Sequence, residues 1–381
     1  MRLSELHLDR YRNIRRAHLT FGDSPLQLIV GDNGQGKTNL LSAIYWLATL
    51  TPLQTHRARE LVMWGEQEAC VRGEVLFRDL THSLSVSYSG QAEQGEGAQV
   101  GGGVGRVAQR GGKRVSPQQY FGALTVVSFT PSDLELVRGA PEERRRFLDR
   151  ALFNERHSHL HAVQSFSAAL EGRNRLLRDA APDPLLSAYE GTLAELGARL
   201  MVARAHYMRE LSPLFQSTLH EICGFSGAVS YKPALQTSDL ITTRVEVIQE
   251  QLAQYWAQSR QSDRLRGFTQ RGPQLDDLAL RLSEHSAKSY ASQGQQRAIA
   301  LALKISQIEH LTARVGERPV LLLDDVSSEL DARRASLLFS FLDRFEGQVF
   351  LTTTHERHIP RHEDAQIWRL EAGTVSDGPP P

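Results

Sequence analysis

The strongest constraint on this chain is the segment GDNGQGKTN, residues 31 to 39, which lies between a short apolar run and a segment of helical periodicity. Its spacing, Gly31 followed after four residues by Gly36, Lys37 and Thr38, is the phosphate-binding P-loop pattern in the strand-to-helix context that the pattern requires. Glycines allow positive φ angles, so successive backbone N–H groups can turn inward onto a phosphate chain. A structural turn without chemistry is disfavoured, because the Lys-Thr pair stands at the right spacing and both flanks are correct.

The residue types of this loop predict a bound nucleotide with its metal. Lys37 reaches the β- and γ-phosphates of ATP, and the Thr38 hydroxyl is placed for Mg²⁺. The helix that begins at Lys37 adds its free N–H groups and the positive end of its dipole. We expect the whole loop to contact the nucleotide: Gly31, Asp32, Asn33, Gly34, Gln35, Gly36, Lys37, Thr38 and Asn39.

Two carboxylates follow a buried strand near the end of the chain. The apolar run of VLLLDDVSSELD, residues 320 to 331, ends in Asp324 and Asp325. In a parallel sheet, ligands gather at the carboxyl ends of the strands, where the P-loop also lies. We expect Asp324 to hold Mg²⁺ through its water shell, and Asp325 to orient or deprotonate a water facing the γ-phosphate. The alternative is an acidic cap on a helix that begins at Ser327 and Ser328.

A second anion site is predicted at the start of another helix. Ser292 precedes a helical segment and Gln295 follows three residues later, which is the arrangement of a capping box. A cap alone is the simpler interpretation, but Gly294 exposes the backbone of the first turn to an anion. Two anion sites and one nucleotide suggest a dimer in which two copies share each nucleotide.

Hydrophobic periodicity predicts an α/β chain with a helical insertion. Alternating patterns predict antiparallel strands, and an apolar run predicts a buried strand at LTVVSF. The alternating segments are residues 2 to 9, 15 to 21, 70 to 78 and 82 to 88. Residues 90 to 112 are rich in glycine, and we interpret them as a surface loop that closes in a hairpin turn at Gly111 and Gly112.

The middle of the chain is predicted to be helical from about 141 to 259, with a break at AAPDP, residues 180 to 184. Two helices of roughly 35 residues would project about 50 Å as an antiparallel hairpin; the alternative is an ordinary helical subdomain folded on itself. The last ninety residues alternate helices and strands, which predicts a parallel sheet built from both ends of the chain. The expected domains are an ATPase domain, 1–135 with 285–381, and an inserted helical lobe, 136–284.

Composition and charge limit which partners the chain is expected to bind and in which compartment it is expected to work. The formal net charge is zero, so any nucleic-acid site must be a local basic face. Cys70 and Cys223 lie far apart and show no metal-ligand spacing, which is typical of a reducing compartment. The N-terminus is predicted to be a strand, and no apolar run approaches the roughly 20 residues that span a bilayer. We expect a soluble, cytoplasmic protein without a membrane partner.

A basic stretch lies between residues 138 and 178, and three consecutive arginines stand near its start: Arg144, Arg145 and Arg146. Arginine suits the DNA backbone because its planar fork binds phosphate bidentately. Such a face would bind DNA without sequence preference and with steep salt dependence. The alternative is a solvated helix surface, because acidic residues three or four positions away can pair with the arginines. These acids are Glu142, Glu143 and Asp149.

With these motifs in order, the chain resembles the ABC-type ATPases. The segment SQGQQ, residues 292 to 296, stands as the signature motif, which in that family caps the γ-phosphate held by the P-loop of the other subunit. The resemblance implies that SSELD, residues 327 to 331, is the D-loop and that His355 is the switch histidine that contacts the γ-phosphate. Taken alone, a histidine after a strand is more usually a surface side chain.

Within that superfamily the chain is similar to the RecF family, bacterial recombination mediators related to SMC heads. Six segments carry this likeness from end to end: LHLDRYRNI, VGDNGQGKTNLLSAIYWL, FTPSDLELVRGAPEERRRFLDRAL, GFTQRGPQLDD, SYASQGQQRAIALALKI and LLLDDVSSELD. The family's loop before the signature usually reads Gly-Pro-His-Arg-Asp-Asp, whereas GPQLDD lacks the His-Arg pair. No Gln ends the VVSF strand either, so the usual Q-loop metal ligand cannot be assigned.

The resemblance implies an ABC-type ATPase head with a mixed β-sheet and a P-loop lobe, plus an inserted helical hairpin. It further implies slow, DNA-stimulated ATP hydrolysis by an ATP-dependent homodimer that closes head to head on double-stranded DNA. The expected sites are gaps or single-strand/double-strand junctions, and the expected partners are RecO and RecR. Two alternatives are a transporter's nucleotide-binding subunit, which would lack long helical insertions, and the head of an SMC-like nuclease complex, which would carry a far longer coiled coil.

Overall fold

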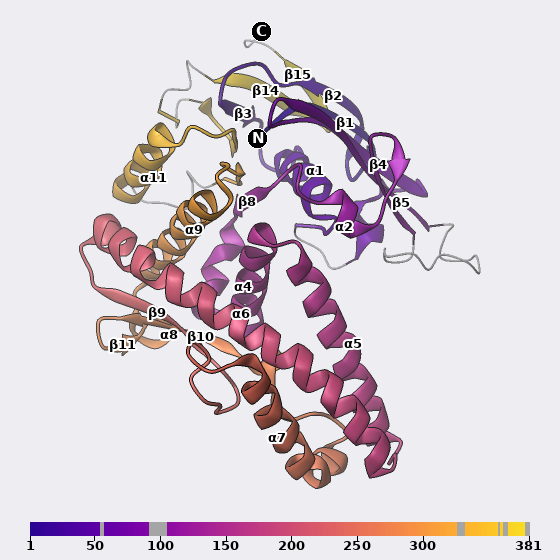
Figure 1. Ribbon diagram of the computed structural model, residues 1–381. Helices are drawn as coiled ribbons and strands as arrows, with labels where there is room; N and C mark the ends of the chain where they lie inside the picture. The colour runs from indigo at the N-terminus through magenta and orange to yellow at the C-terminus, as the bar shows by residue number, and fades with distance from the viewer. Residues whose placement is uncertain (54–56, 91–104, 326–331, 357–358, 361–364, 378–381) are drawn as a thin grey trace. The chain divides into compact units, whose positions relative to one another are not determined.

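The computed structural model describes residues 1–53, 57–90, 105–325, 332–356, 359–360 and 365–377 (Figure 1). The chain divides into two compact units, one made of Met1–Pro131 with Leu311–Pro381, and the other of Ser132–His310. The first unit is therefore assembled from both ends of the chain, and the second is inserted between them.

The first unit contains an antiparallel sheet of six strands in the order β2-β1-β4-β5-β6-β7. Its strands are β1 (Arg2–Tyr11), β2 (Ile14–Thr20), β4 (Glu68–Phe77), β5 (Leu80–Ser89), β6 (Arg106–Arg110) and β7 (Lys113–Arg114). The four strands predicted from alternation are confirmed, as is the turn at Gly111 and Gly112, whose φ angles are 59° and 74°. The interpretation of residues 90 to 112 as a loop is wrong for its last part, because β6 pairs with β5.

The P-loop strand belongs to a second six-stranded sheet of the same unit, ordered β15-β14-β3-β13-β12-β8. Its strands are β3 (Leu26–Val30), β8 (Val126–Phe129), β12 (Val320–Leu323), β13 (Val349–Thr353), β14 (Gln366–Glu371) and β15 (Thr374–Asp377). All neighbours are parallel except β14 and β15. Strands β8, β12 and β13 are buried along their whole length, as continuous apolar runs in parallel sheets usually are.

Helix α1 (Lys37–Thr49) lies between these two sheets. It contacts β1, β4 and β5 of the antiparallel sheet and β8, β12 and β13 of the parallel sheet (Figure 1). Ten of its thirteen residues are buried, and Trp46 is fully enclosed. The P-loop therefore ends in a helix that is fixed on two sides. The other described helices that lie wholly in this unit are η1 (Ala58–Leu61), α2 (Pro117–Tyr120) and α11 (Ala332–Arg344).

The second unit is mainly helical. Its helices are α3 (Glu135–Arg138), α4 (Pro141–Glu155), α5 (Ser158–Arg178), α6 (Asp183–Cys223), α7 (Val245–Arg266), η4 (Pro273–Leu275) and α8 (Ala287–Tyr290). Two helices cross the unit boundaries along the chain. The short helix η3 (Pro131–Leu134) lies at the start of the second unit, and the 23-residue helix α9 (Gln293–Val315) lies at its end. A small antiparallel sheet, β11-β10-β9, completes it with β9 (Gly227–Lys232), β10 (Asp277–Leu282) and β11 (His285–Ser286).

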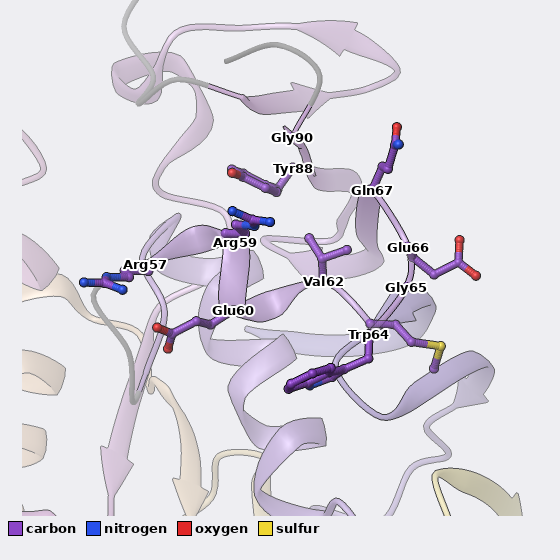
Figure 2. Close-up of a pocket in the computed structure, with 11 residues that line it drawn as sticks. Arg57, Arg59, Glu60, Val62, Trp64, Gly65, Glu66, Gln67, Tyr88 and Gly90 are labelled. Carbon is purple, nitrogen blue, oxygen red and sulfur yellow. The ribbon is translucent and has the colours of Figure 1, made fainter. Parts of the chain in front are cut away.

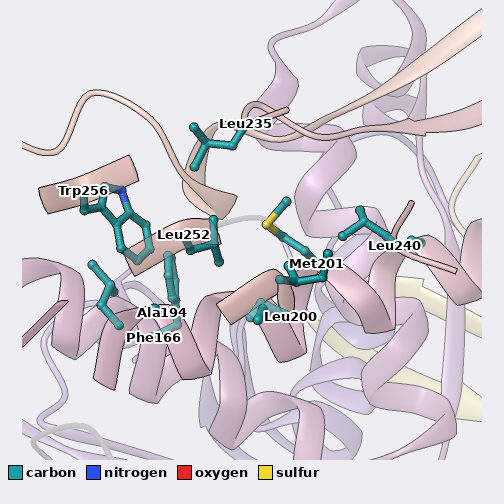
Figure 3. Packing of buried hydrophobic residues seen from close by; sticks show 12 residues of the cluster. Phe166, Ala194, Leu200, Met201, Leu235, Leu240, Leu252 and Trp256 are labelled. Carbon is teal, nitrogen blue, oxygen red and sulfur yellow. The ribbon is translucent and has the colours of Figure 1, made fainter. Parts of the chain in front are cut away.

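Three long helices share the core of this unit. The break predicted at residues 180 to 184 is confirmed, because α5 ends at Arg178 and α6 begins at Asp183. Helix α6 has 41 residues, which at 1.5 Å per residue makes it about 60 Å long. It packs on both α5 and α7 around Phe166 and Trp256 (Figure 3). The third helix and the small sheet make this a folded subdomain rather than a bare two-helix hairpin.

A buried ionic network joins the three long helices. The Arg173 side chain is fully buried and pairs with Glu190 at 3.0 Å and with Asp263 at 2.9 Å. Its guanidinium also donates to the Thr269 hydroxyl at 2.7 Å. Arg260 supplies a second cation to Glu190 at 2.5 Å. Because every charge in the network has a partner, the helices are held in one relative register.

A histidine near the end of this unit is held by two glutamates. His310 lies 2.6 Å from Glu155 and 3.1 Å from Glu210. Burial alone would lower the pKa of His310, but its hydrogen bonds and charge contacts with the two glutamates outweigh burial and raise that pKa.

Among the described residues, no helix has both the length and the apolar character needed to cross a membrane.

Candidate nucleotide site

The P-loop takes the conformation that its glycines predict. Gly34 and Gly36 have φ angles of 82° and 113°, in the region that residues with a Cβ rarely occupy. A Cβ on Gly36 would lie 2.6 Å from the Asn13 amide nitrogen, and one on Gly31 would lie 2.4 Å from the Leu370 carbonyl oxygen. Gly31 is therefore required by close packing against the backbone, and Gly34 and Gly36 by backbone conformation.

The turn between β1 and β2 holds the loop from the side. The Asn13 amide donates to the Gln35 carbonyl at 2.8 Å and accepts from the Asn39 amide at 2.8 Å. The Arg12 guanidinium donates to the Asn39 side chain at 2.7 Å. Sequence reasoning missed Arg12 and Asn13 as supports of the loop, because 22 to 27 positions separate them from the residues that they contact.

The start of α1 is open to an anion. Gly36 caps the helix without a side-chain hydrogen bond, and the first turn contains no acidic residue. The Lys37 side chain is 7% exposed, and its ammonium donates to the carbonyls of Gly31 at 2.6 Å and Asp32 at 2.9 Å. The phosphates of a nucleotide would exchange with these carbonyls, since both present oxygen acceptors to the same cation.

Thr38 and Asp324 lie in direct contact although 286 positions separate them. The Thr38 hydroxyl is 2.8 and 2.9 Å from the two carboxylate oxygens of Asp324, which follows β12. The Thr352 hydroxyl, on the neighbouring strand β13, donates to the same carboxylate at 3.0 Å. Burial raises the pKa of Asp324, its hydrogen bonds to Thr38 and Thr352 offset this in part, and the charge of Asp325 raises it further.

These atoms fit a Mg²⁺ site. Mg²⁺ binds hard oxygen ligands, usually one or two protein groups together with water and phosphate. Thr38 and Asp324 supply a hydroxyl and a carboxylate side by side at the open end of the P-loop. A dication would also neutralise a carboxylate that its buried surroundings disfavour as an anion.

Asp325 and His355 lie at the same edge of the parallel sheet. Asp325 is half-buried and has a φ of 48°, a left-handed conformation that Asp tolerates better than most residues. Its N–H donates to the Thr352 hydroxyl at 2.8 Å. His355 is exposed and follows β13, whose Thr353 pairs with Val30 at the start of the P-loop. The predicted D-loop, residues 327 to 331, lies outside the described residues.

The second anion site belongs to the helical unit and has the hydrogen bonds of a capping box. The Ser292 N–H donates to the Gln295 side chain at 2.8 Å, and the Gln295 N–H approaches the Ser292 hydroxyl at 3.3 Å. Ser292 itself is exposed, and Gly294 lies in the first turn of the 23-residue helix α9. The cap interpretation is confirmed, and it leaves the nucleotide role of this site a prediction.

The three arginines predicted to bind DNA lie on α4 and have acidic or carbonyl partners. Arg144 is 5% exposed and donates to both carboxylate oxygens of Asp277 at 2.6 and 3.1 Å. Arg145 donates to the Asp276 carbonyl at 2.8 Å. Arg146 pairs with Glu142 at 2.6 Å and with Glu143 at 3.0 Å, as the alternative of a paired helix surface predicted. Arg144 and Arg145 thus tie α4 to the segment that begins β10.

The acidic pair of GPQLDD has a structural role that the sequence did not reveal. Asp276 is fully buried and pairs with Arg204 at 3.0 Å. It also accepts a hydrogen bond from the Tyr231 hydroxyl and another from the Ala234 N–H at 2.8 Å. The signal that could have found it is two acids directly before a strand, since buried carboxylates need several donors.

A separate cavity of about 730 Å³ lies in the first unit beside η1 (Figure 2). Arg57, Arg59, Trp64 and Tyr88 line it, and Trp64 is 98% exposed. None of the predicted nucleotide-site residues belongs to its lining. It is therefore not the site that the P-loop forms.

Comparisons with known proteins find matches over nearly the whole chain. The model of the RecF/RecN/SMC N-terminal domain matches residues 2–372. The DNA replication and repair protein RecF of Myxococcus xanthus is 42% identical over 358 residues, which cover 93% of this chain and 91% of that protein. A solved structure of the recombination mediator protein RecF with ATP in the RecFOR pathway has a TM-score of 0.88 at 28% identity, covering 99% of this chain and 97% of that one.

A solved SMC head bound to the C-terminal winged-helix domain of ScpA shares the fold. Its TM-score is 0.54 at 12% identity, and the match covers 99% of this chain and 96% of that one. The α/β head fold predicted from the sequence is thereby confirmed.

Proposed function

The chain belongs to the RecF/RecN/SMC family, and from that membership we propose that it is an ATP-dependent DNA-binding protein of DNA replication and repair. It is an ABC-type ATPase of the RecF kind. Two copies close head to head on duplex DNA with ATP between them, and hydrolysis reopens the dimer. We assign the ATPase head to residues 1–135 and 285–381 and the inserted lobe to 136–284.

The observation that carries this proposal is the contact between the P-loop helix and the end of β12. The Thr38 hydroxyl lies 2.8 Å from Asp324, so both side chains reach the place where the β- and γ-phosphates of ATP would lie. Bound Mg²⁺ supplies charge neutralisation there. Lys37 holds the phosphates with its ammonium and the open end of α1 adds N–H donors, so this chain binds and orients the nucleotide mainly through one loop.

Asp325 and His355 are the residues that we assign to hydrolysis. Asp325 accepts the proton of the attacking water, and His355 contacts the γ-phosphate from the end of β13. ABC-type ATPases usually carry Glu after the Mg²⁺-binding Asp, and the side chain of Asp325 is one methylene shorter. An attacking water must lie within about 3 Å of its base. A shorter side chain therefore holds that water less well. Hydrolysis is then slow, and the closed state is long-lived.

The signature site provides the second half of each nucleotide site. Ser292, Gly294 and Gln295 of one copy cap the γ-phosphate held by the P-loop of the other. Ser292 is exposed, as a residue at a subunit joint must be before association. The phosphate would meet the first turn of α9, where backbone N–H groups and the helix dipole favour an anion.

DNA binding is assigned to the duplex backbone at gaps and single-strand/double-strand junctions. Of the three arginines on α4, Arg146 is the one that can release its half-exposed acidic partners for a phosphate, whereas Arg144 is buried against Asp277. RecO and RecR are the proposed partners, by the family resemblance and the RecFOR pathway of the solved relative. The proposed location is the cytoplasm.

The shared-nucleotide dimer is tested at Ser292. Ser292→Arg places bulk and charge in the proposed joint, whereas loss of the cap costs only about 1 kcal/mol, so the chain should stay folded and bind ATP. Ser262→Arg on α7 is the matched control, since Ser262 is also exposed in the same unit. We expect sedimentation velocity with ATP to show dimers for wild type and the control but monomers for Ser292→Arg. Dimerisation of all three at the same concentration would reject the proposal.

A further inference from the structure

We propose that Glu5, His7 and His18 form a binding site for a transition-metal dication such as Zn²⁺. The three residues lie on the face of the antiparallel sheet that points away from its buried core, on strands β1 and β2. This site has no residue in common with the nucleotide site.

Strand register brings the two histidines together. His7 and His18 are direct partners across β1 and β2, and Glu5 lies two residues before His7 on the same face. The imidazole rings are stacked, with their centroids 4.0 Å apart and their planes 15° from parallel. Because cross-strand neighbours are fixed by backbone hydrogen bonds, rotation of the two rings about their side-chain bonds can bring both to one ion without backbone movement.

The spacing of the donor atoms fits tetrahedral coordination. A Glu5 carboxylate oxygen lies 3.4 Å from the His7 Nε2 and 3.8 Å from the His18 Nε2. All three donor atoms fall within 4.8 Å of one another. Zinc bonds of about 2.0–2.1 Å to nitrogen and oxygen place tetrahedral ligands roughly 3.3–3.4 Å apart. The Glu5–His18 distance has to shorten by a few tenths of an ångström, and both imidazole rings have to rotate out of their stack so that each turns a nitrogen toward the ion.

The chemistry of the donors selects the class of metal. Two neutral imidazoles and one carboxylate suit Zn²⁺, Co²⁺, Ni²⁺ or Cu²⁺, whereas Mg²⁺ and Ca²⁺ prefer oxygen ligands only. Three protein ligands leave a fourth position for water, which is typical of an accessible site rather than a closed structural one.

The charged residues of the neighbouring strand β4 do not disfavour a cation at this site. Glu74 lies across from Glu5 and adds negative charge, whereas Arg72 lies across from His7. The local charge is therefore compatible with a dication.

A metal here would clamp the two strands whose turn supports the P-loop. His7 and His18 are fixed on either side of the turn that carries Arg12 and Asn13, and these residues hydrogen-bond to the loop. Metal occupancy should therefore raise the thermal stability of the first unit, because the ion binds the folded pairing and not the separated strands.

Co²⁺ provides the direct test, because a tetrahedral Co²⁺ site with nitrogen ligands has strong visible absorption. The full chain without a histidine tag is titrated with Co²⁺, and Zn²⁺ is then added to displace it. We expect one equivalent of tetrahedral Co²⁺ in wild type, an increase in Tm with Zn²⁺, and affinity at least about tenfold weaker in His18→Gln and in Glu5→Gln. His220→Gln, an exposed histidine on α6, is the matched control and should behave as wild type.

The outcomes separate the proposal from its alternatives. Both site variants replace side chains outside the buried core, and circular dichroism checks that they fold. If wild type shows no tetrahedral absorption, the three residues form only a cross-strand contact of imidazoles with a carboxylate. If the absorption survives in both site variants, the ion binds elsewhere among the chain's 14 histidines, and the assignment is overturned.

Discussion

Asp325→Asn should slow ATP hydrolysis by about 10²- to 10⁴-fold without weakening ATP binding, because it removes the proton acceptor and keeps the size of the side chain. At 1.36 kcal/mol per tenfold, this is an increase of about 2.7–5.4 kcal/mol in the activation free energy. The backbone should not change, since φ at this position is 48° and Asn tolerates the left-handed region as Asp does. Asp325→Ala would add backbone strain to the loss of the carboxylate, so Asn is the cleaner probe.

Asp325→Glu tests the effect of side-chain length at this position on the rate of hydrolysis. If the short side chain is the reason for slow turnover, one added methylene should speed hydrolysis, although Glu is less favourable at a positive φ. Single-turnover hydrolysis with the chain in excess over ATP separates the chemical step from product release. Equal rates for wild type and Asp325→Asn would refute the assignment of the base, and a slower rate for Asp325→Glu would refute the argument from arm length.

Three further predictions concern binding, packing and pH. Lys37→Ala should abolish ATP-dependent dimerisation, whereas Lys37→Arg should keep some binding of a fluorescent ATP but little turnover; tight binding by the Ala variant would be inconsistent with the site. Arg173→Met leaves the carboxylate of Asp263 buried without its cation and should cost about 3–5 kcal/mol in urea unfolding, against about 0.5 kcal/mol for the exposed helix-pair control Arg199→Met. Because the folded-state pKa of His310 is raised, its contribution is complete below the unfolded value of 6.5 and is lost as pH rises through the folded pKa. The free energy of unfolding should therefore fall above pH 6.5 more steeply in wild type than in His310→Gln, and parallel pH profiles would contradict this.

Local patterns in the sequence were enough to predict the elements around the P-loop. The positive φ angles of Gly34 and Gly36 follow from the motif, and the contact of Thr38 with Asp324 follows from the rule that ligands gather where parallel strands end. The capping box at Ser292 is likewise encoded within four residues. Such features depend on neighbours in sequence or on the general geometry of parallel sheets.

Contacts between distant residues could not be predicted in this way. Arg144 is separated from Asp277 by 133 positions, so its sequence neighbours suggested a phosphate contact rather than a buried ion pair. Asn13 lies in LHLDRYRNI, which carries the family likeness, but nothing in that segment indicates that its turn supports the P-loop. Strand β6 was missed because glycine-rich composition concealed its short alternation, and pairing with β5 supplies the stability that propensity does not.

Mixing two inactive variants tests whether two copies share each ATP. Lys37→Ala lacks the P-loop cation but keeps Ser292, and Ser292→Arg keeps the P-loop but lacks the signature site. In a mixed dimer, the P-loop of the Ser292→Arg chain faces the intact signature of the Lys37→Ala chain, so one composite nucleotide site is restored. Sedimentation with ATP on duplex DNA should show monomers of each variant alone and a heterodimer in the mixture. A mixture that stays monomeric, or either variant dimerising alone as wild type does, would contradict the shared site.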